Sequence, residues 1–502
     1  MNKWEKRKIK KEFNTNKDYY LKNLTEASEL ILKHIDNNSK ISNVTDFDTD
    51  GLGCSYVMDW LFKQLNYDNY NIYIPDRSEG YGLSMEYIKN NKDIDLIITA
   101  DNGISKYKEV EYAKSLGISV IITDHHNLPP ILPDCIIVNP KLESSDYMKD
   151  VCGTGVVWFL AKEVLRIKGI KANVDEILDM VACSTIADMV SLDGCNRELV
   201  IKGLKLLNDK KYSSKGLEMM FSQFGSEITS ETIAFGVSAI FNSLGRLKHM
   251  NIAYEFLCKG KTDIYDEIIE NNEHRKRLQQ KFSSLALKEV DTSQNIIIYE
   301  NNDIPKGLIG LVASDLMNKF YKPTIVMANG GGSGRSVNDI DLYDVVFNKN
   351  SDFVESGGGH TKAIGVNITN VCSFKEQLEK YANLHFTKEQ LTPSLYYYDE
   401  VYPKNLEQDF IEVNKSAPFG IGNLKSNVII RNQTIQSIRV VGKLQNVLQI
   451  TFESRLKGVK FKTMSHSLKQ GDVIDVLGSI SKNEWNGWIN YQIIIEDYKV
   501  KT

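Results

Sequence analysis

Residues 41–51 have the sequence ISNVTDFDTDG, a short apolar run followed by three alternating acidic residues. The run predicts a buried β-strand, and Asp46, Asp48 and Asp50 follow it directly. Ligands of parallel α/β sheets bind at the carboxyl ends of strands. Carboxylates so close together repel one another, and a divalent cation relieves that repulsion. The segment therefore predicts a metal site at the end of a buried strand.

The pattern of residues 41–51 is repeated along the chain. Further apolar runs alternate with helical patterns, at Tyr70–Ile74, Asp95–Thr99, Val120–Ile122 and Cys135–Val138. Strands that alternate with helices indicate βαβ units and a parallel sheet. We therefore expect an α/β fold in this half of the chain.

More candidate ligands follow these strands. Asp101 comes after a second predicted strand, Asp124, His125 and His126 come after a third, and Asp188 lies on or near a helix. Carboxylates combined with neutral imidazoles suit manganese, and zinc or iron less specifically. An EF-hand calcium loop does not fit, because no Glu occupies the twelfth position of the acidic loop.

These clusters suggest a reaction class. Two divalent ions that share carboxylates can clamp the attacking and leaving oxygens of an in-line phosphoryl displacement. A histidine that is not a ligand could contact the scissile phosphate or donate a proton. Taken singly, Asp101 could cap a helix and His126 could be a hydrogen-bonded core residue. Three clusters at strand ends favour metal-assisted phosphoester hydrolysis instead.

Composition limits the class of protein. The 502 residues include 61 Lys and Arg against 65 Asp and Glu, a net charge of −4, with 42% hydrophobic residues. This balance is globular and excludes a uniformly basic nucleic-acid coat, although a local basic groove remains compatible with it. The length predicts about three domains. Seven dispersed cysteines without a C-x-x-C pair favour reduced thiols in the cytoplasm over disulfides or a zinc site.

Targeting and membrane segments are not expected. The basic N-terminus has no apolar region after it that would make a signal peptide, and no run approaches the roughly 20 apolar residues of a transmembrane helix. We expect a soluble cytoplasmic protein without a membrane partner. The basic run Lys3–Lys11 is most simply a solvated end.

Four motifs carry a family resemblance. DFDTDG (46–51), ADNG (100–103), TDHH (123–126) and ADMVSLDGCNR (187–197) resemble, in order, the four motifs of the DHH phosphoesterase superfamily. The segments PDRSEGYG, FNSLGR, GLIGLVAS, SGRS and GGGHTKAIG are similar to the connector and DHH-associated domain of the RecJ family. APFGIGN and NEWNGWINYQIIIED resemble its OB-fold region. The resemblance covers residues 40–498.

The resemblance implies an architecture and an activity. The implied segments are an N-terminal helical segment (1–39), a parallel-sheet DHH catalytic domain (40–205), a helical connector (206–290), a smaller α/β DHH-associated substrate-binding domain (291–390) and a C-terminal OB-type β-barrel that binds single strands (391–502). The implied activity is that of a single-stranded-DNA-specific 5′→3′ exonuclease, which releases 5′-mononucleotides in DNA repair and recombination. Its cofactors would be two divalent ions, Mn²⁺ first and Mg²⁺ second.

Site residues follow from the motif positions. The resemblance implies metal binding by Asp46, Asp48, Asp50, Asp101, His125 and Asp188, with Asp101 as the bridging ligand. His126 would face the scissile phosphate, and Asp124 would orient the neighbouring histidines.

A second set of residues would bind phosphate. Small residues around Arg335 and His360 allow several donors to approach one anion, although tight turns with an incidental cation would look the same. The resemblance implies phosphate contacts by Arg77, Arg246, Ser333, Arg335 and His360, with Asn242 in support. Arg77 would read the 5′-terminal phosphate.

The C-terminal region contains aromatic residues that could stack on bases, and lysines that could follow a strand. The aromatic candidates are Trp485, Trp488 and Tyr491, and the lysines are Lys457, Lys460, Lys462 and Lys482. In a β-rich module such aromatic residues are more often part of the core. The expected partner is single-stranded DNA with a free 5′ end, and a single-strand-binding protein and a helicase are further candidates. We expect a monomer.

Two other functions remain open at this point. A DHH phosphodiesterase could act on short oligonucleotides or cyclic dinucleotides, although such small substrates need no OB-like region. An inactive DNA-binding relative would bind without cleaving, although the full set of ligands argues against it. The chain also departs from the usual RecJ pattern, with Ile304 and Pro305 where Trp-His is common.

Overall fold

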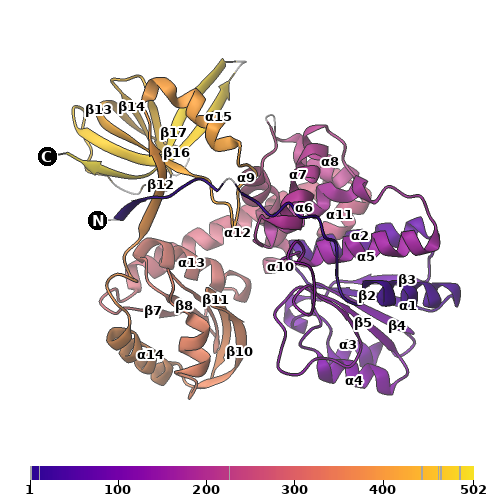
Figure 1. The fold of residues 1–502 in the computed structure, drawn as a ribbon. Coiled ribbons are helices and arrows are strands. Elements are labelled where there is room, and N and C mark those ends of the chain that lie inside the picture. Colours follow the sequence, from indigo (N-terminus) through magenta and orange to yellow (C-terminus); the bar gives the residue numbers. More distant parts are fainter. Residues whose placement is uncertain are drawn as a thin grey trace. The chain divides into compact units, whose positions relative to one another are not determined.

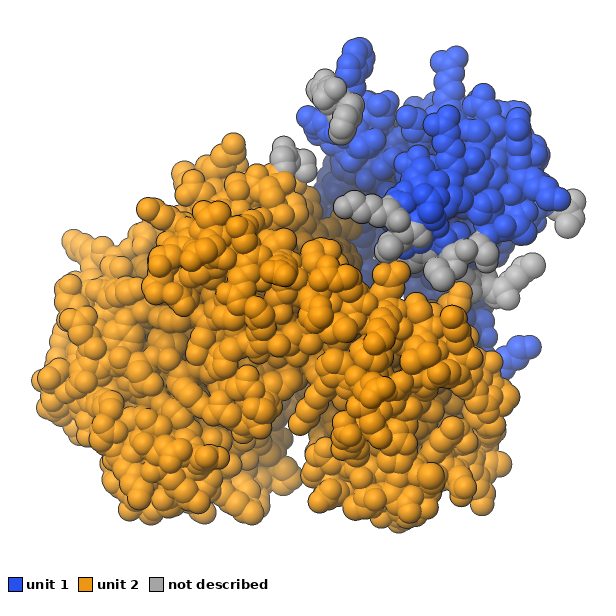
Figure 2. Space-filling view, turned by 180° about the vertical axis from the view of Figure 1, so that it is seen from behind, with its two compact units in different colours: residues 1–12, 386–419, 423–502 blue, residues 13–385, 420–422 orange. Residues whose placement is uncertain are grey.

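The computed structural model describes residues 3–10, 12–224, 227–442, 445–461, 463, 466–485 and 488–501, without the side chain of Trp485. Lys11, Lys462 and the Trp485 side chain, which the sequence pointed to, thus lie outside the described parts. The chain forms two compact units (Figure 2). The main unit contains residues 13–385 and 420–422, and the C-terminal unit contains residues 1–12, 386–419 and 423–502.

The main unit begins with an all-parallel sheet in the order β3-β2-β4-β5-β6. Its strands are β2 (Ile41–Thr45), β3 (Tyr70–Tyr73), β4 (Leu96–Ala100), β5 (Ser119–Thr123) and β6 (Ile136–Val138). Successive side chains of a strand point to opposite faces of the sheet. Accordingly, Leu96 and Ile98 lie in one apolar cluster and Ile97 lies in another. The central strands β2 and β4 are buried along their whole length, and β4 has the apolar sequence LIITA that is usual for a parallel strand covered on both faces. The predicted α/β architecture is confirmed.

Helices cover both faces of this sheet (Figure 1). One face packs against α2 (Thr49–Gln64) and α5 (Gly153–Lys168), with α1 (Leu24–Asp36) beside α5. The other face packs against α3 (Met85–Asn90) and α4 (Tyr107–Ser115). The fold thus places the loops after β2, β4 and β5 at one edge of the sheet.

A helical region continues the same apolar cluster and leads to the second sheet. It consists of α6 (Leu178–Ala187), α7 (Gly194–Asn208), α8 (Lys215–Ser222), α9 (Ser230–Thr232), a π-helical turn (Ile233–Ser238), α10 (Ala239–Leu247), α11 (Asn251–Lys259) and the long α12 (Thr262–Glu289). In α10, Gly245 packs directly on the backbone carbonyl of Phe47, and any Cβ there would clash with that oxygen. Arg246 donates to Gly307 O at 3.0 Å. Helix α10 therefore joins the loop after β2 to the second α/β domain.

The second domain is a mixed sheet in the order β10-β11-β9-β8-β7, in which only β7 and β8 are parallel. Its elements are β7 (Ile297–Glu300), α13 (Ile309–Phe320), β8 (Thr324–Ala328), β9 (Gly331–Arg335), β10 (Val354–His360), β11 (Ala363–Ile368) and α14 (Val371–His385). The glycine-rich segments before Arg335 and His360 are thus strands, which composition did not predict because glycine is depleted in strands. Ile304 is 2% exposed in the apolar core.

The C-terminal unit is a barrel closed by β13, which pairs with both β14 and β16. The elements are β12 (Ser394–Glu400), α15 (Leu406–Asn414), β13 (Asn427–Val441), β14 (Val447–Phe452), β15 (Lys457–Lys460), β16 (Val473–Trp485) and β17 (Trp488–Val500). Apolar side chains from β13, β14, β16, β17 and α15, together with Leu456 just before β15, form its core. The predicted OB-type barrel is confirmed.

The N-terminal residues differ from the expected solvated end. Strand β1 (Lys3–Lys6) lies parallel to β12 and extends the barrel sheet. The Trp4 indole donates to Asp497 at 2.8 Å. No local pattern could show this strand, because its hydrogen-bonding partner lies at the other end of the chain.

The described helices include none with the length and apolar composition needed to cross a bilayer.

Candidate metal centre and phosphate-binding residues

The acidic loop after β2 turns directly into α2. Asp46 is 6% exposed and accepts a hydrogen bond from Phe47 N at 2.7 Å. Asp48 caps α2 by accepting from Asp50 N at 2.9 Å and from Gly51 N at 3.0 Å. Asp46 and Asp48, two residues apart, thus accept hydrogen bonds from different backbone N–H groups of the same short turn.

Asp50 is held by the start of another helix. Its carboxylate accepts from Gly153 N at 2.8 Å and from Thr154 N at 3.0 Å, the first two residues of α5. The positive end of the 16-residue helix stabilises this charge. A Cβ at Gly153 would lie 2.7 Å from the Asp101 side chain, so only glycine allows the two carboxylates to approach.

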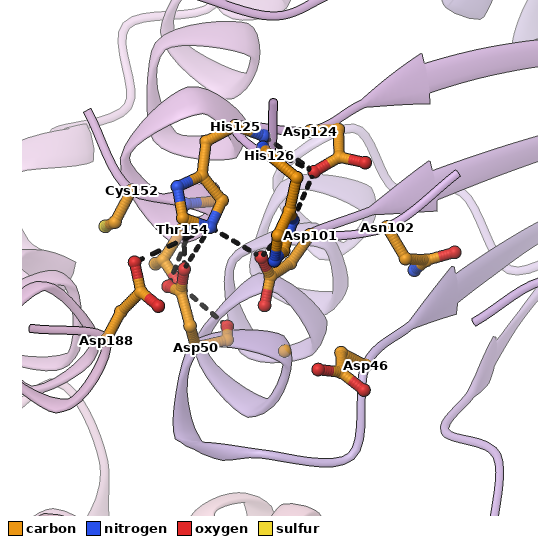
Figure 3. Close-up of polar contacts among 12 residues, drawn as sticks. Asp46, Asp50, Asp101, Asn102, Asp124, His125, His126, Cys152, Thr154 and Asp188 are labelled. Carbon is orange, nitrogen blue, oxygen red and sulfur yellow. Dashed lines mark hydrogen bonds and ion pairs between the residues drawn. The ribbon is translucent and has the colours of Figure 1, made fainter. Parts of the chain in front are cut away.

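Asp101, His125 and Asp188 converge on the same point (Figure 3). Nε2 of His125 lies 3.1 Å from Oδ1 of Asp101 and 3.5 Å from Oδ2 of Asp188. Asp101 has a φ of +62°, in the left-handed region, and Asp188 ends α6. Three separate chain segments thus bring their donor atoms together.

The donor set fits divalent cations. Asp101 Oδ1, His125 Nε2 and Asp188 Oδ2 are buried atoms without a hydrogen-bond partner among the described residues. Three groups have ligand atoms within 4.8 Å of one another: Asp46, Asp48 and Asp101; Asp50, His125 and Asp188; Asp101, His125 and His126. Because buried polar atoms usually have a partner, these atoms are suited to coordinate a divalent cation.

The pKa values of these residues also indicate a cation site. Burial, and then neighbouring carboxylates, raise the pKa values of Asp46, Asp101 and Asp188 well above the ordinary range. The pKa of Asp48 is also raised, first by burial and then by Asp50. Burial, and then the charge of His126, lower the pKa of His125 to about 4, so this ring is neutral and free to coordinate. A cation would remove the repulsion among the carboxylates.

His126 has a different environment from His125. Its Nδ1 lies 2.8 Å from Asp124 Oδ1, while that oxygen also accepts from the backbone N of His125 and His126. Burial alone would lower the pKa of His126, but the hydrogen bond and charge of Asp124 raise it to about 9. Burial would raise the pKa of Asp124, yet the hydrogen bond with His126 lowers it. The pair therefore combines a buried carboxylate with a half-buried imidazolium.

The predicted arginines come together on the other side of Phe47. Arg77 stacks over the Phe47 ring at 4.3 Å and donates to Gly245 O at 2.8 Å. Burial, and then the charges of Arg77 and Arg335, lower the pKa of Arg246 to about 10. None of the three arginines forms an ion pair within the part of the chain that the structure describes. Clustered arginines without carboxylate partners suit a bound anion.

The remaining predicted phosphate ligands take varied positions. Ser333 Oγ accepts from Arg335 at 2.9 Å, so these two belong to one cluster. Asn242 instead accepts from the backbone and hydroxyl of Thr49, and so holds the acidic loop. The exposed His360 lies 3.2 Å from the Asn127 side chain.

The aromatic candidates of the C-terminal unit differ from one another. Trp488 is 77% exposed. Tyr491 packs on Phe410 of α15 at 5.3 Å and its hydroxyl lies 3.4 Å from Glu407. Trp488 is therefore available for stacking on a base, whereas Tyr491 belongs to the contact between the barrel and α15.

Sequence reasoning did not assign four residues of the site. Gly153 and Thr154 hold Asp50, Tyr81 contacts Asp101 and His126, and Arg275 adds positive charge near Arg246. Gly153 at the start of a predicted helix could have pointed to the pair Gly153 and Thr154. The sequence GYG could have pointed to Tyr81. Nothing local pointed to Arg275.

The cation fit can be tested with Asp101→Asn. At a Mn²⁺ concentration 100 times the Kd, binding should stabilise the wild-type chain by about 2.7 kcal/mol, and a tenfold loss of affinity would reduce this to about 1.4 kcal/mol. We expect at least that loss in the variant. Without metal the variant should be no less stable than wild type, because asparagine tolerates the left-handed backbone and removes a repelled charge. Thermal unfolding with and without Mn²⁺ measures both effects.

The matched control is Asp146→Asn, whose side chain is 92% exposed and lies 3.8 Å from Lys149. Its response to Mn²⁺ should equal that of wild type. Equal Mn²⁺ stabilisation of the Asp101 variant and wild type would contradict the assignment.

Comparison with known proteins identifies all three domains. Family models match the DHH family N-terminal domain at residues 40–185, the DHHA1 domain at 293–384 and the RecJ OB domain at 399–497.

Individual relatives agree with the family models. The single-stranded-DNA-specific exonuclease RecJ of Bacillus subtilis is 30% identical over 96% of this chain, which covers 64% of that protein. RecJ of Salmonella typhimurium is also 30% identical, over 75% of this chain and 71% of the relative. The crystal structure of Thermus thermophilus RecJ in complex with Mn²⁺ superposes with a TM-score of 0.84 at 25% identity, covering 95% of this chain and 72% of the other. The chain therefore belongs to the RecJ family of single-stranded-DNA-specific exonucleases.

Proposed function

We propose that this chain is a metal-dependent exodeoxyribonuclease that removes nucleotides stepwise from the 5′ end of single-stranded DNA. One observation carries the proposal: an acidic cluster contains buried ligand atoms that have no hydrogen-bond partner among the described residues, and two of its carboxylates interact electrostatically with clustered arginines. Asp46 and Asp48 act electrostatically on Arg77, and Asp48 also acts on Arg246. A phosphodiester placed there would meet cations on one side and arginines on the other.

The acidic cluster would hold two divalent ions, Mn²⁺ or Mg²⁺. The residues that would hold them are Asp46, Asp48, Asp50, Asp101, His125 and Asp188. Bound there, the ions would polarise the scissile phosphodiester and neutralise the charge that develops on it. The Thermus relative, which holds Mn²⁺, supports this choice of metal.

His126 would supply a proton or a hydrogen bond to the scissile phosphate. Asp124 holds its Nδ1, so the substrate would meet Nε2, which lies 3.4 Å from the Tyr81 hydroxyl. Asp124 also accepts from Ile104 N at 3.0 Å, which keeps the carboxylate from turning away. The pair is arranged as a general acid with its orienting carboxylate.

Arginines would fix the end of the strand. Arg77 would bind the 5′-terminal phosphate, with Arg246, Arg335, Ser333 and His360 on neighbouring phosphates, and Asn242 would support them through its hold on Thr49. These groups would make cleavage start at the 5′ end, since only the end of a strand offers a terminal phosphate.

The C-terminal barrel would bind the rest of the strand, with Trp488 and, by sequence, Trp485 as stacking platforms. We also propose a cytoplasmic location, which the seven free cysteines support. A helicase that frees strand ends and a single-strand-binding protein are the proposed protein partners.

Digestion of labelled oligonucleotides tests the activity. With Mn²⁺, a 5′-labelled single strand should release labelled mononucleotide from the start of the reaction. The same strand labelled at its 3′ end should shorten progressively, and a blunt duplex should resist, because only a single strand can reach the cluster.

Other product patterns would contradict this function. Rapid cleavage of dinucleotides with little action on long strands would favour the small-substrate phosphodiesterase. Binding of single strands without Mn²⁺-dependent cleavage would favour an inactive DNA-binding relative.

Arg246→Ala tests the arginine cluster through salt dependence. In an Asp101→Asn background, which keeps the DNA intact, loss of one phosphate contact should make the slope of log Kd against log[salt] shallower by about 0.7 for a single strand. Fluorescence anisotropy with a 5′-phosphorylated oligonucleotide measures the slope. The control is Arg166→Ala, because Arg166 is exposed and paired with Glu163 at 2.7 Å. Identical slopes for both variants would exclude Arg246 from phosphate binding.

A further inference from the structure

The loop that carries Tyr81 is attached to the two strands that carry the acidic residues. Asn102 is fully buried and its amide donates to Val44 O at 3.0 Å and Ala100 O at 2.9 Å. Its side-chain oxygen accepts from Leu83 N at 3.1 Å. The loop around Tyr81 is therefore fixed relative to the ends of β2 and β4.

From this loop the Tyr81 hydroxyl reaches the centre of the site. It donates to the backbone carbonyl of Asp101 at 2.9 Å and lies 3.4 Å from Nε2 of His126. The ring meets Phe47 and His126 edge-on, at 6.3 Å and 5.9 Å between centroids. One side chain thus contacts the backbone of a shared ligand, the ring of the proposed acid and the acidic loop.

Asp101 needs such support because its backbone is strained. Its φ of +62° is unusual for a residue other than glycine, and such conformations persist only when the surroundings hold them. Asp101 N donates to Thr123 O at 2.9 Å, and Tyr81 holds the carbonyl on the other side of the residue. Both backbone polar groups of Asp101 are therefore fixed.

His126 is held at both ring nitrogens in a comparable way. Asp124 lies at Nδ1 and the Tyr81 hydroxyl lies near Nε2, so the ring has little freedom to rotate. Neighbours that orient a ligand or an acid commonly control activity without touching the reacting atoms.

We propose that Tyr81 is a positioning residue for the exonuclease reaction, whose hydroxyl sets the backbone of Asp101 and the ring of His126. The inference rests on the proposed function for its kinetic consequence. Its structural consequence, a correctly placed Asp101 carboxylate, also applies to Mn²⁺ binding alone.

Tyr81→Phe tests this role, because it removes the hydroxyl and keeps the ring packing. We expect kcat on a 5′-phosphorylated single strand to fall about 10-fold or more while KM stays within about twofold, as for loss of an orienting partner. The matched control is Tyr20→Phe, which removes a hydroxyl that is bonded 3.0 Å from Glu143 at the surface and should leave kcat unchanged. Melting temperatures of both variants verify folding.

Two results would overturn the proposal. An unchanged kcat would show that the hydroxyl positions nothing, and a raised KM at constant kcat would assign Tyr81 to DNA contact instead. If the wild-type chain releases no nucleotide, the proposed function fails, and Mn²⁺ titration followed by electron paramagnetic resonance then decides on Tyr81. Weaker Mn²⁺ binding in Tyr81→Phe than in Tyr20→Phe would support the role, and equal binding would refute it.

Discussion

Mutual repulsion among buried carboxylates is the constraint on which this protein's structure depends. Parallel strands end side by side, so the acidic residues after β2 and β4 meet at one edge of the sheet. The fold stabilises one of these charges internally, since the start of α5 donates two hydrogen bonds to Asp50. Among the described residues, it leaves one buried atom each of Asp101, His125 and Asp188 without a hydrogen-bond partner. Cations bound there would relieve the repulsion that the protein alone leaves, which would tie metal binding and chemistry to the same few residues.

The second constraint is the close contact of α10 with the acidic loop. Gly245 packs on the carbonyl of Phe47, and Asn242 accepts two hydrogen bonds from Thr49. The next residue, Arg246, bonds to Gly307 of the second domain. A single helix thus links the acidic loop to the arginines and to the second domain. Substitutions in α10 should therefore affect catalysis although the helix carries no metal ligand.

Sequence predicted the parts of the structure that depend on local patterns. The runs before Asp46, Asp101 and Asp124 are strands, as predicted, and those before Asp101 and Asp124 have the apolar cores that buried parallel strands usually have. Motif order pointed to the candidate ligands, which the fold brings together, yet no pattern could show that Asp50 is held by α5 or that Tyr81 reaches Asp101, since those contacts join distant segments. Strand β1 was not predicted because it pairs with a strand near the other end of the chain. Strand β9 was not predicted because its glycines lack the side chains that mark a strand.

We propose that the carboxylate cluster holds two cations and that Asp101 is a ligand of both. Anomalous diffraction at the manganese absorption edge, from crystals of the full chain grown with Mn²⁺, tests it most directly. The account predicts two peaks, one against Asp46, Asp48 and Asp101 and one against Asp50, His125 and Asp188. A single peak, or peaks remote from Asp101, would contradict the two-metal centre.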